Sequence, residues 1–271
     1  MMNGMVEKIK SVVDKSKVPH HLVDEFYFWR SYDKRKIEGF KNIHNGKRCF
    51  IIGNGPSLNA IDLTKLKNEY TFGVNSIFLK QDELVPTYYV VEDYHVAHDN
   101  AGDITSFTGP VKFIPRNYKQ WIKPKGDTVF YNMNTGYYQE FSPSYKIPRF
   151  SKDFSNRAYC GQSVTMICLQ LAFYMGFDSV YLVGMDFNYE IPTSAVIEPG
   201  GVILSTEDDP NHFDPTYFGK GKRWHDPHLD RVGRSYHFIK GVYEAHDKEI
   251  INATVGGKLE IFEREDFANL F

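Results

Sequence analysis

The chain has 271 residues, of which 42% are hydrophobic and 24% charged, and its formal net charge is −2 at pH 7. This length and apolar content suffice for a full core in one large domain or two small ones, whereas the lack of a basic surplus argues against a nucleic-acid partner. Because the apolar runs are too short to span a bilayer and no apolar signal block opens the chain, we expect a cytoplasmic protein, and peripheral association with a membrane surface stays open.

The first 45 residues differ in pattern from the remainder. Apolar residues between Val6 and Val13 recur at helical spacing, and an aromatic-rich stretch follows as far as Trp29. We therefore expect an N-terminal helical segment over residues 1–45 that packs onto an α/β body over residues 46–271.

The body begins with an apolar run over residues 48–53 that ends in a glycine-rich turn, Gly-Asn-Gly-Pro-Ser, over residues 53–57. Gly53 and Gly55 lack a Cβ and let the backbone approach an anion, while Ser57 can cap a following helix whose amides face outward. The pattern predicts a strand that leads into a phosphate or nucleotide site. An ordinary tight turn is the alternative.

Two familiar nucleotide-binding signatures are absent from this turn. The dinucleotide fingerprint needs a third glycine where the chain has Leu58, and a later acidic residue where residues 71–76 carry none. A P-loop needs a lysine at a place where this turn has none. The turn thus favours an anion site of a different kind.

Further short β-rich runs alternate with polar and helical segments along the body. They lie at residues 70–77, 88–93, 111–115, 127–132, 179–185 and 249–253. A helix is predicted between Gly161 and Gly176 and another from Val232 to about Ala245. Continuous apolar strands that alternate with helices predict an α/β fold with a mostly parallel, Rossmann-like sheet covered by helices on both faces.

Polar side chains follow several of these runs where the strands would end. The turn over residues 53–57 follows the first strand, Asn75 the second, Glu92 and Asp93 the third, and Asp186 a later one. In open α/β sheets, ligands bind beyond the carboxyl ends of the strands. We therefore expect these groups to gather at one edge as a single site.

Residues 188–232 interrupt the alternation and carry five of the 13 prolines of the chain. A long segment with little periodicity inside a compact domain is typical of a functional lid, with a disordered surface insertion as the alternative. The aromatic residues and histidines of the segment argue against disorder. Its basic run over residues 220–223 is either a solvated face or a phosphate clamp, and opposite a phosphate-binding turn we favour the clamp.

Four motifs together resemble bacterial sialyltransferases of the Campylobacter lipooligosaccharide type. They are Ile-Ile-Gly-Asn-Gly-Pro-Ser-Leu over residues 51–58, Asn75, Gly-Gln-Ser over residues 161–163 and Gly-Met-Asp-Phe over residues 184–187. They equally resemble the 6-hydroxymethylpterin pyrophosphokinase-like family, which also contains motility-associated glycosyltransferases. The resemblance covers about residues 46–190 well and the lid loosely. It implies one nucleotide-binding catalytic domain whose lid closes over donor and acceptor, with CMP-sialic acid as donor and no metal.

The resemblance also carries donor-binding roles onto positions of this chain. They are Gly53, Asn54 and Gly55 for the phosphate and ribose, Asn75 for the nucleotide, Asp93 for the region near the transferred sugar, and Ser163 for the sugar carboxylate. Ser57 and Asp186, from the same motifs, complete the predicted donor site in the body. The relatives have a tyrosine after the Asp-Phe pair, where this chain has Asn188, and part of the phosphate-binding pair is thereby changed.

A second departure from the sialyltransferase pattern concerns the catalytic base. Those enzymes carry a lid segment Tyr-Ile-Gly-His, whereas this chain has Tyr-Phe-Gly-Lys ending at Lys220. A lysine acts as a base only when burial lowers its pKa far, so we hypothesise that His212, or alternatively His225, is the base. Tyr217, Lys220 and Arg223 are then expected to neutralise the donor phosphate.

We expect a glycosyltransferase that moves a CMP-activated sialic-acid-like or Kdo-like sugar onto a cell-surface glycan or a protein. The histidine- and aspartate-rich runs over residues 208–212 and 225–230 match no zinc spacing, so we expect no metal and no cofactor. The alternatives are an ATP- and magnesium-dependent pyrophosphokinase of 6-hydroxymethyl-7,8-dihydropterin and a non-catalytic nucleotide-binding module. The oligomeric state is left undetermined by the sequence.

Overall fold

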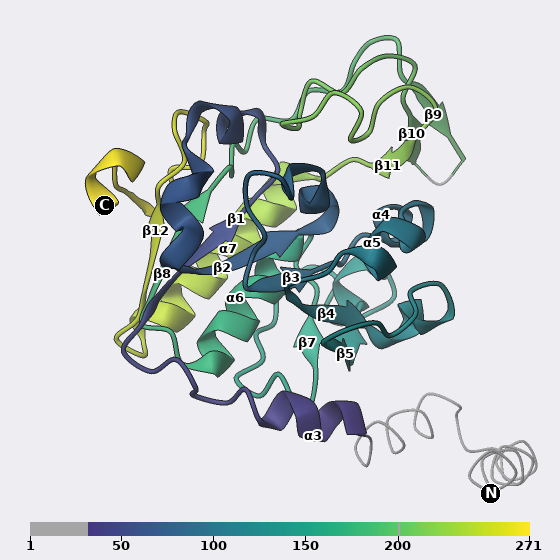
Figure 1. The fold of residues 1–271 in the computed structure, drawn as a ribbon. Coiled ribbons are helices and arrows are strands. Elements are labelled where there is room, and N and C mark those ends of the chain that lie inside the picture. The colour runs from purple at the N-terminus through teal and green to yellow at the C-terminus, as the bar shows by residue number, and fades with distance from the viewer. Residues whose placement is uncertain (1–31, 200) are drawn as a thin grey trace, which may run out of the picture.

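The computed structural model describes residues 32–199 and 201–271 (Figure 1). Its centre is an eight-stranded sheet with the strand order β13-β12-β8-β1-β2-β3-β4-β5, in which every pairing is parallel. The strands are β1 (Arg48–Ile52), β2 (Tyr70–Val74), β3 (Tyr88–Val90), β4 (Val111–Pro115), β5 (Thr128–Tyr131), β8 (Ser179–Val183), β12 (Glu249–Asn252) and β13 (Glu263–Arg264). The predicted α/β class with a parallel sheet is therefore confirmed, and β13 is a strand that the sequence pattern does not predict.

Side chains alternate across the sheet and supply two cores. In β1, Cys49 and Ile51 belong to one buried cluster, while Phe50 and Ile52 belong to the other, on the opposite face. All four are fully buried, as expected for a central strand covered on both sides. The apolar run that predicts β1 is thus continuous because both of its faces are interior.

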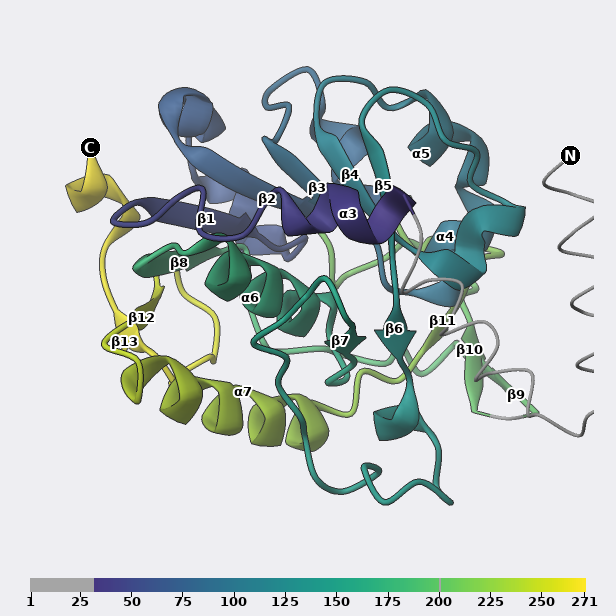
Figure 2. The same cartoon turned by 90° about the horizontal axis from the view of Figure 1, so that it is seen from below.

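Helices α6 (Val164–Met175) and α7 (Leu229–Glu244) pack side by side under one face of the sheet (Figure 2). The helix α6 is buried almost all round because it lies between the sheet and α7. Ser163 caps its first turn by accepting a hydrogen bond from the Thr165 amide, and Gly176 ends it in the left-handed conformation, with φ of 91°. Both predicted helices are confirmed.

The opposite face is covered mainly by short elements. They are η1 (Pro56–Ala60), η2 (Leu63–Asn68), η3 (Asn75–Lys80), α4 (Tyr94–Asp99), α5 (Ala101–Ser106), η4 (Arg116–Gln120) and η6 (Phe267–Leu270). The expectation of helices on both faces holds in this form, with single turns of 3-10 helix in place of longer α-helices. The predicted second strand is also shorter, because Asn75 adopts a left-handed φ of 48° and turns the chain into η3.

The remaining described elements lie outside the central sheet. Helix α3 (Tyr32–Glu38) packs against β5, and the part of the predicted N-terminal helical segment before residue 32 lies outside the described residues. The pair β6 (Met133–Asn134) and β7 (Ala158–Tyr159) forms a small parallel sheet, and η5 (Gly136–Tyr138) follows β6.

The predicted lid over residues 188–232 projects past the strand ends (Figure 1). The prediction that it is irregular is wrong in part, because it holds an antiparallel sheet of β9 (Val196–Glu198), β10 (Val202–Leu204) and β11 (Arg223–His225). These strands are only three residues long, too short for a period to show in the sequence.

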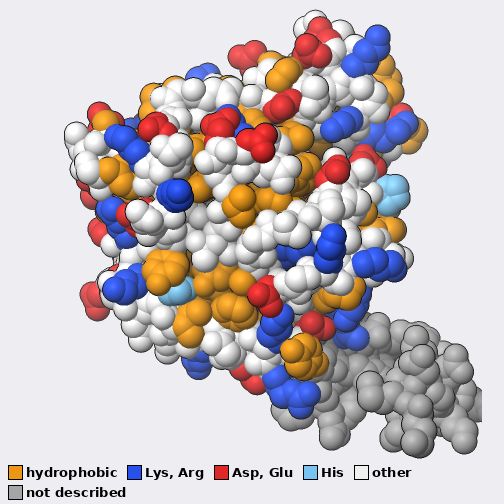
Figure 3. All heavy atoms as spheres, viewed as in Figure 1, with side chains coloured by type: hydrophobic (Ala, Val, Ile, Leu, Met, Phe, Trp, Pro, Cys, Tyr) orange, Lys and Arg blue, Asp and Glu red, His pale blue; other side chains and the backbone are white. Residues whose placement is uncertain are grey.

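Two observations bear on the expectations about nucleic-acid and membrane partners. On the face seen in Figure 3, acidic and basic side chains are interspersed. Within residues 32–199 and 201–271, no helix has the length and apolar character that crossing a bilayer requires.

The strand order changes direction between β1 and β8, and there the two following turns touch. The amide of Gly53 donates to the Val183 carbonyl at 2.8 Å, and that of Gly55 donates to the Gly184 carbonyl at 2.9 Å. A Cβ at Gly53 would lie well inside contact distance of the Gly184 carbonyl oxygen and 2.8 Å from the Met185 sulfur. Glycine is needed here for the close packing of two backbones.

We predict that Gly53→Ala destabilises the protein by about 1–3 kcal/mol, the usual effect of overpacking a filled site. The measurement is urea unfolding without any ligand. Gly102→Ala in α5 is the matched control, because nothing lies within 4 Å of the added carbon, and it should be neutral or slightly stabilising. A Gly53→Ala protein as stable as the control would contradict the packing argument.

Candidate active-site cleft

A cleft of about 840 Å³ lies beyond the carboxyl ends of the central strands and beneath the lid. Its size is that of a site for a small organic ligand, and its position is where open α/β sheets bind ligands. Most of the predicted site residues line it. They are Gly53, Asn54, Gly55, Asn75, Asp93, Ser163, Asp186, His212, Tyr217 and His225. The structure thus brings residues from distant parts of the chain into one site, while Ser57, Lys220 and Arg223 lie outside its lining.

The glycine-rich turn is built differently from the prediction. The amides of Gly53 and Gly55 are bonded to the turn after β8, and the Ser57 amide donates to the Asp186 carboxylate at 3.2 Å. The Ser57 hydroxyl donates to the same carboxylate at 2.7 Å. The helix η1 begins after Gly55 without a side-chain cap, so the prediction that Ser57 caps it is wrong. The amides of Gly53, Gly55 and Ser57 therefore hold the turn in place, and the Asp186 carboxylate stabilises it further.

Asn54 is the member of the turn whose side chain keeps a polar atom that is unpaired within the described part of the chain. Its Nδ2 donates to the Val74 carbonyl at 3.0 Å and to the Tyr217 hydroxyl at 2.9 Å. Because the Val74 carbonyl can only accept, the amide orientation is fixed. Its Oδ1 is buried and has no hydrogen-bond partner among the described residues. A buried acceptor without a partner costs free energy, so a ligand donor here would be favourable.

The ends of β2 and β3 supply the next groups. The Asn75 side-chain oxygen accepts from the Glu92 amide at 3.4 Å, and Asn75 lines the cleft. Asp93 is the N-cap of α4 and accepts from the Val96 amide at 2.8 Å. Each of these predicted residues therefore accepts a local backbone hydrogen bond through its side chain and also lines the cleft.

Glu92 is a cleft residue that the sequence indicates only as the neighbour of Asp93. Its side chain is 8% exposed and accepts from the Tyr138 hydroxyl at 2.6 Å. Burial, reinforced by the charge of Asp93 and opposed by the Tyr138 hydrogen bond, raises the pKa of Glu92 to about 7. A carboxyl group in this range changes its charge near neutral pH, a property common in functional sites.

Arg231 supplies the positive charge of the cleft, and the sequence patterns do not single it out. It lies in the first turn of α7, where its Nε donates to the Gln162 side-chain oxygen at 3.0 Å and its Nη2 donates to the Tyr137 carbonyl. Its guanidinium carbon lies 4.3 Å from the ring centroids of both Tyr137 and Tyr145. These contacts orient the guanidinium before any ligand binds.

Among the described residues that line the cleft, Arg231 is the only lysine or arginine. The carboxyl groups in that lining belong to Glu92, Asp93, Asp186 and Asp226. Within the described ranges no three His, Cys, Asp or Glu side chains converge as a metal-binding group. The cleft therefore offers one fixed cation in mainly acidic and polar surroundings.

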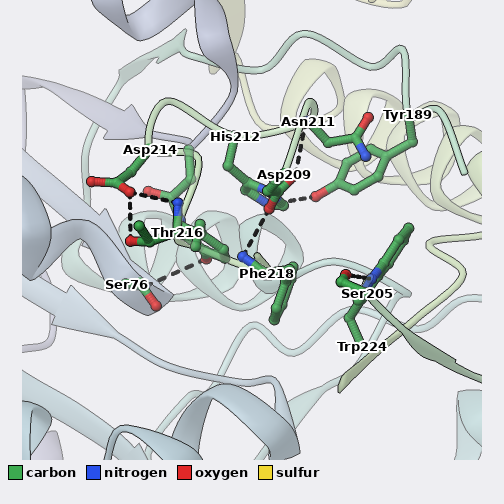
Figure 4. Close-up of polar contacts among 12 residues, drawn as sticks. Ser76, Tyr189, Ser205, Asp209, Asn211, His212, Asp214, Thr216, Phe218 and Trp224 are labelled. Carbon is green, nitrogen blue, oxygen red and sulfur yellow. Dashed lines mark hydrogen bonds and ion pairs between the residues drawn. The ribbon is translucent and has the colours of Figure 1, made fainter. Parts of the chain in front are cut away.

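The predicted base His212 is embedded in the lid (Figure 4). Its Nδ1 lies 2.7 Å from the Asp209 carboxylate, its Nε2 lies 2.8 Å from the Tyr189 hydroxyl, and its ring is stacked on Tyr217 with centroids 3.9 Å apart. Tyr217 is 2% exposed, and burial raises its pKa. Its hydroxyl is therefore neutral and bonded to Asn54, an arrangement that ties the lid to the glycine-rich turn.

The other predicted lid residues lie farther out. Lys220 is exposed, and Arg223 is paired with Glu198, its Nε 2.7 Å from the carboxylate. His225 is exposed at the rim, with its ring 4.8 Å from that of His95. Partial desolvation lowers the pKa of His225, although the charge of Asp93 opposes the shift. His225 can accept a proton at neutral pH, whereas Arg223 already has a partner outside the cleft.

We predict that Glu92 makes stability fall as pH rises between about 4.5 and 7. In this interval the folded state keeps the proton that the unfolded state loses, so the folded state loses up to about 3 kcal/mol relative to the unfolded state. The measurement is urea unfolding from pH 4 to 8. The free energy of unfolding of Glu92→Gln should rise relative to that of the natural protein through that window, and the difference should stay constant above it. Glu140→Gln, at an exposed carboxyl group, controls for the loss of one charge, and parallel pH curves for natural and Glu92→Gln proteins would refute the assignment.

Comparisons with known proteins place this fold and cleft in context. A model of the family described as 6-hydroxymethylpterin diphosphokinase MptE-like matches residues 20–192. Among solved structures, the sialyltransferase CstII from Campylobacter jejuni, in complex with the substrate analogue cytidine-5'-monophosphate, is similar over 81% of this chain and 85% of that chain, with 16% sequence identity and a TM-score of 0.36. A search of curated proteins gave no match. Because the family model spans more than half of the chain, which confirms the resemblance to this family, the protein belongs to the 6-hydroxymethylpterin diphosphokinase MptE-like family.

Proposed function

We propose that the protein is a glycosyltransferase that moves a sugar from a nucleotide-activated donor onto an alcohol group of a glycan or a protein. The donor that fits the cleft best is a CMP-activated acidic sugar of the sialic-acid or Kdo kind. The protein would need no cofactor of its own for this transfer. The observation that carries the proposal is Arg231, whose guanidinium is the only one among the described lining residues, which are otherwise acidic or neutral.

Arg231 selects the sugar donor by the number of its negative charges. A CMP-activated acidic sugar carries one phosphodiester charge and one carboxylate, which Arg231 and the amino-terminal end of α6 beside Ser163 can share. A nucleoside di- or triphosphate brings more negative charge close to the carboxyl groups of Glu92, Asp93 and Asp186. Like charges at short range repel, so the cleft favours the monophosphate-linked donor unless a divalent cation accompanies the nucleotide.

The neutral polar groups suit the nucleoside part of such a donor. The unpaired Oδ1 of Asn54 is an acceptor, and a ribose hydroxyl or a cytosine amino group is the kind of donor that satisfies it. Asn75 lies beside it at the end of β2. We assign these two residues to the nucleoside and Arg231 to the phosphate.

The transfer itself requires a proton acceptor. The acceptor oxygen bonds to the anomeric carbon and loses its proton, while the nucleotide leaves with the electron pair of the bond that breaks. A positioned base contributes about a hundredfold to ten-thousandfold in rate. We propose His212, with its Asp209 partner, as the source of this basicity, and His225 at the rim as the alternative.

A second candidate is pyrophosphate transfer from ATP to a pterin alcohol, which the description of the family favours. The excess of carboxyl groups in the cleft is also compatible with a magnesium-bound nucleotide. Such a reaction needs Mg²⁺, which one or two carboxylates and the phosphates of the nucleotide can hold together. We derive no step through this ion, and nucleotide binding decides between the candidates.

We predict that CMP stabilises the protein whether or not magnesium is present. The measurement is a thermal-shift panel of CMP, CDP, UMP, GMP and ATP, each with Mg²⁺ and with EDTA. At a hundredfold excess over its Kd, a ligand that binds only the folded state adds about 2.7 kcal/mol of stability. Stabilisation by ATP alone, and only with Mg²⁺, would reject the transferase and support the diphosphokinase.

Replacement of Arg231 should weaken binding of the phosphate and not of the nucleoside. We expect Arg231→Gln to raise the Kd of CMP about tenfold to a hundredfold, the effect of losing a hydrogen bond to a charged group, and to leave the Kd of cytidine nearly unchanged. Arg234→Gln is the matched control, because Arg234 lies in the same helix but outside the cleft lining. Calorimetric titration checks both.

Arg223→Gln in the same titration tests the sequence-based clamp. Because Arg223 is paired with Glu198, we expect little change in CMP binding. Equal losses of CMP and cytidine binding in Arg231→Gln would show that Arg231 supports the structure and does not bind phosphate.

A further inference from the structure

Three side chains of the lid form a continuous hydrogen-bonded chain that ends at the cleft. Asp209 contacts His212 Nδ1 at 2.7 Å, and His212 Nε2 contacts the Tyr189 hydroxyl at 2.8 Å (Figure 4). Tyr189 and His212 both line the cleft. Tyr189 is half-buried, whereas the side chains of Asp209 and His212 are 3% and 5% exposed. Tyr189 is therefore the most exposed member of this chain of side chains.

The surroundings of Asp209 determine which atom donates in each hydrogen bond of this chain of side chains. Besides His212, its carboxylate accepts hydrogen bonds from the amides of Asn211 at 2.8 Å and Phe218 at 2.9 Å. Burial alone would raise the pKa of Asp209, but the hydrogen bond and charge of His212, together with these amides, lower it overall. An ionised carboxylate can only accept, so His212 carries its proton on Nδ1. Its Nε2 then holds a lone pair, and the Tyr189 hydroxyl donates to it.

His212 has no nitrogen left for a substrate. Both ring nitrogens are engaged, and one ring face is covered by Tyr217 at an interplanar angle of 4°. The Tyr189 hydroxyl contacts His212 and belongs to a residue of the cleft lining, so it can pass its proton to His212 while it accepts another from a ligand. This is the arrangement of an acid–histidine–nucleophile triad, with a phenol at the position next to the substrate.

We propose that the Tyr189 oxygen takes the proton of the acceptor alcohol while His212 takes the phenolic proton of Tyr189. The inference rests on the proposed transfer to an alcohol. The alcohol O–H bond breaks as a new phenolic O–H bond forms, the former phenolic proton moves to Nε2, and Asp209 stabilises the imidazolium. No oxidant, metal or co-reactant is required, and the proton returns through Tyr189 when product leaves. Tyr189 is then the catalytic residue, and His212 and Asp209 are positioning residues that make it basic.

The charges around this chain explain why a free phenolate is not involved. Burial raises the pKa of Tyr189, and the nearby Tyr217, Asp209, Asp93 and Tyr236 raise it further. Tyr189 is therefore protonated at neutral pH and can act only by passing its proton to His212 as it receives another.

Tyr189→Phe tests the proposal because it removes only the hydroxyl. With CMP-N-acetylneuraminic acid as the probe, and release of CMP to water or an added galactoside as readout, we expect kcat to fall about a hundredfold or more and the Kd of CMP to stay within twofold. Tyr243→Phe is the control, since that buried hydroxyl donates to the Leu169 carbonyl away from the cleft. An unchanged kcat, or an equal loss of CMP binding, would overturn the proposal.

A second measurement needs no substrate. Nitrogen-15 NMR of the histidine side chains reports the tautomer of His212, and we expect protonation on Nδ1 in the natural protein and its loss in Asp209→Asn. Protonation on Nε2 in the natural protein would reverse the chain and overturn the proposal. If the natural protein releases no CMP from the probe, the proposed transferase fails, and the tautomer still decides whether Tyr189 is a proton donor to His212.

Discussion

Two backbone hydrogen bonds join the turn after β1 to the turn after β8, and the geometry of the cleft depends on them. Gly53 and Gly55 donate to Val183 and Gly184, which brings the two turns together where the strand order reverses. Asp186 adds a brace by accepting from Ser57. With the amides of Gly53, Gly55 and Ser57 used internally, these three groups are not offered to the cleft.

The lid is held over the cleft by polar contacts with the same turn. The Phe213 amide donates to the Asn54 carbonyl at 2.8 Å, and Asn59 donates to the Phe213 carbonyl at 2.9 Å. Tyr217 adds a hydrogen bond to the Asn54 side chain. Because Tyr217 also stacks on His212, the position of the histidine is coupled to the position of the glycine-rich turn. Asn54 and the hydrogen-bonded side chains of the lid are thus structurally connected.

The positive charge and the carboxyl groups of the cleft come from different elements of the fold. Arg231 enters from α7 and is oriented by Gln162 and two tyrosine rings, so it provides a rigid point for one anionic group. Of the carboxyl groups, Glu92 and Asp93 follow β3, Asp186 follows β8 and Asp226 lies in the lid, and burial raises the pKa of Glu92 to about 7. Among the described lining residues, one arginine thus lies with four carboxyl groups, and like charges at short range repel.

The parallel sheet, the helices α6 and α7 and the place of Asn54, Asn75 and Asp93 at strand ends could be predicted from the sequence, because buried strands are continuous apolar runs and α/β sheets bind ligands beyond strand ends. The internal hydrogen bonds of the Gly53, Gly55 and Ser57 amides could not, since they depend on contact with a segment about 130 residues away. The fold alone brings Arg231 into the cleft and pairs Arg223 with Glu198. The same holds for the placement of Tyr189 against His212, because contacts between residues distant in the chain leave no local pattern.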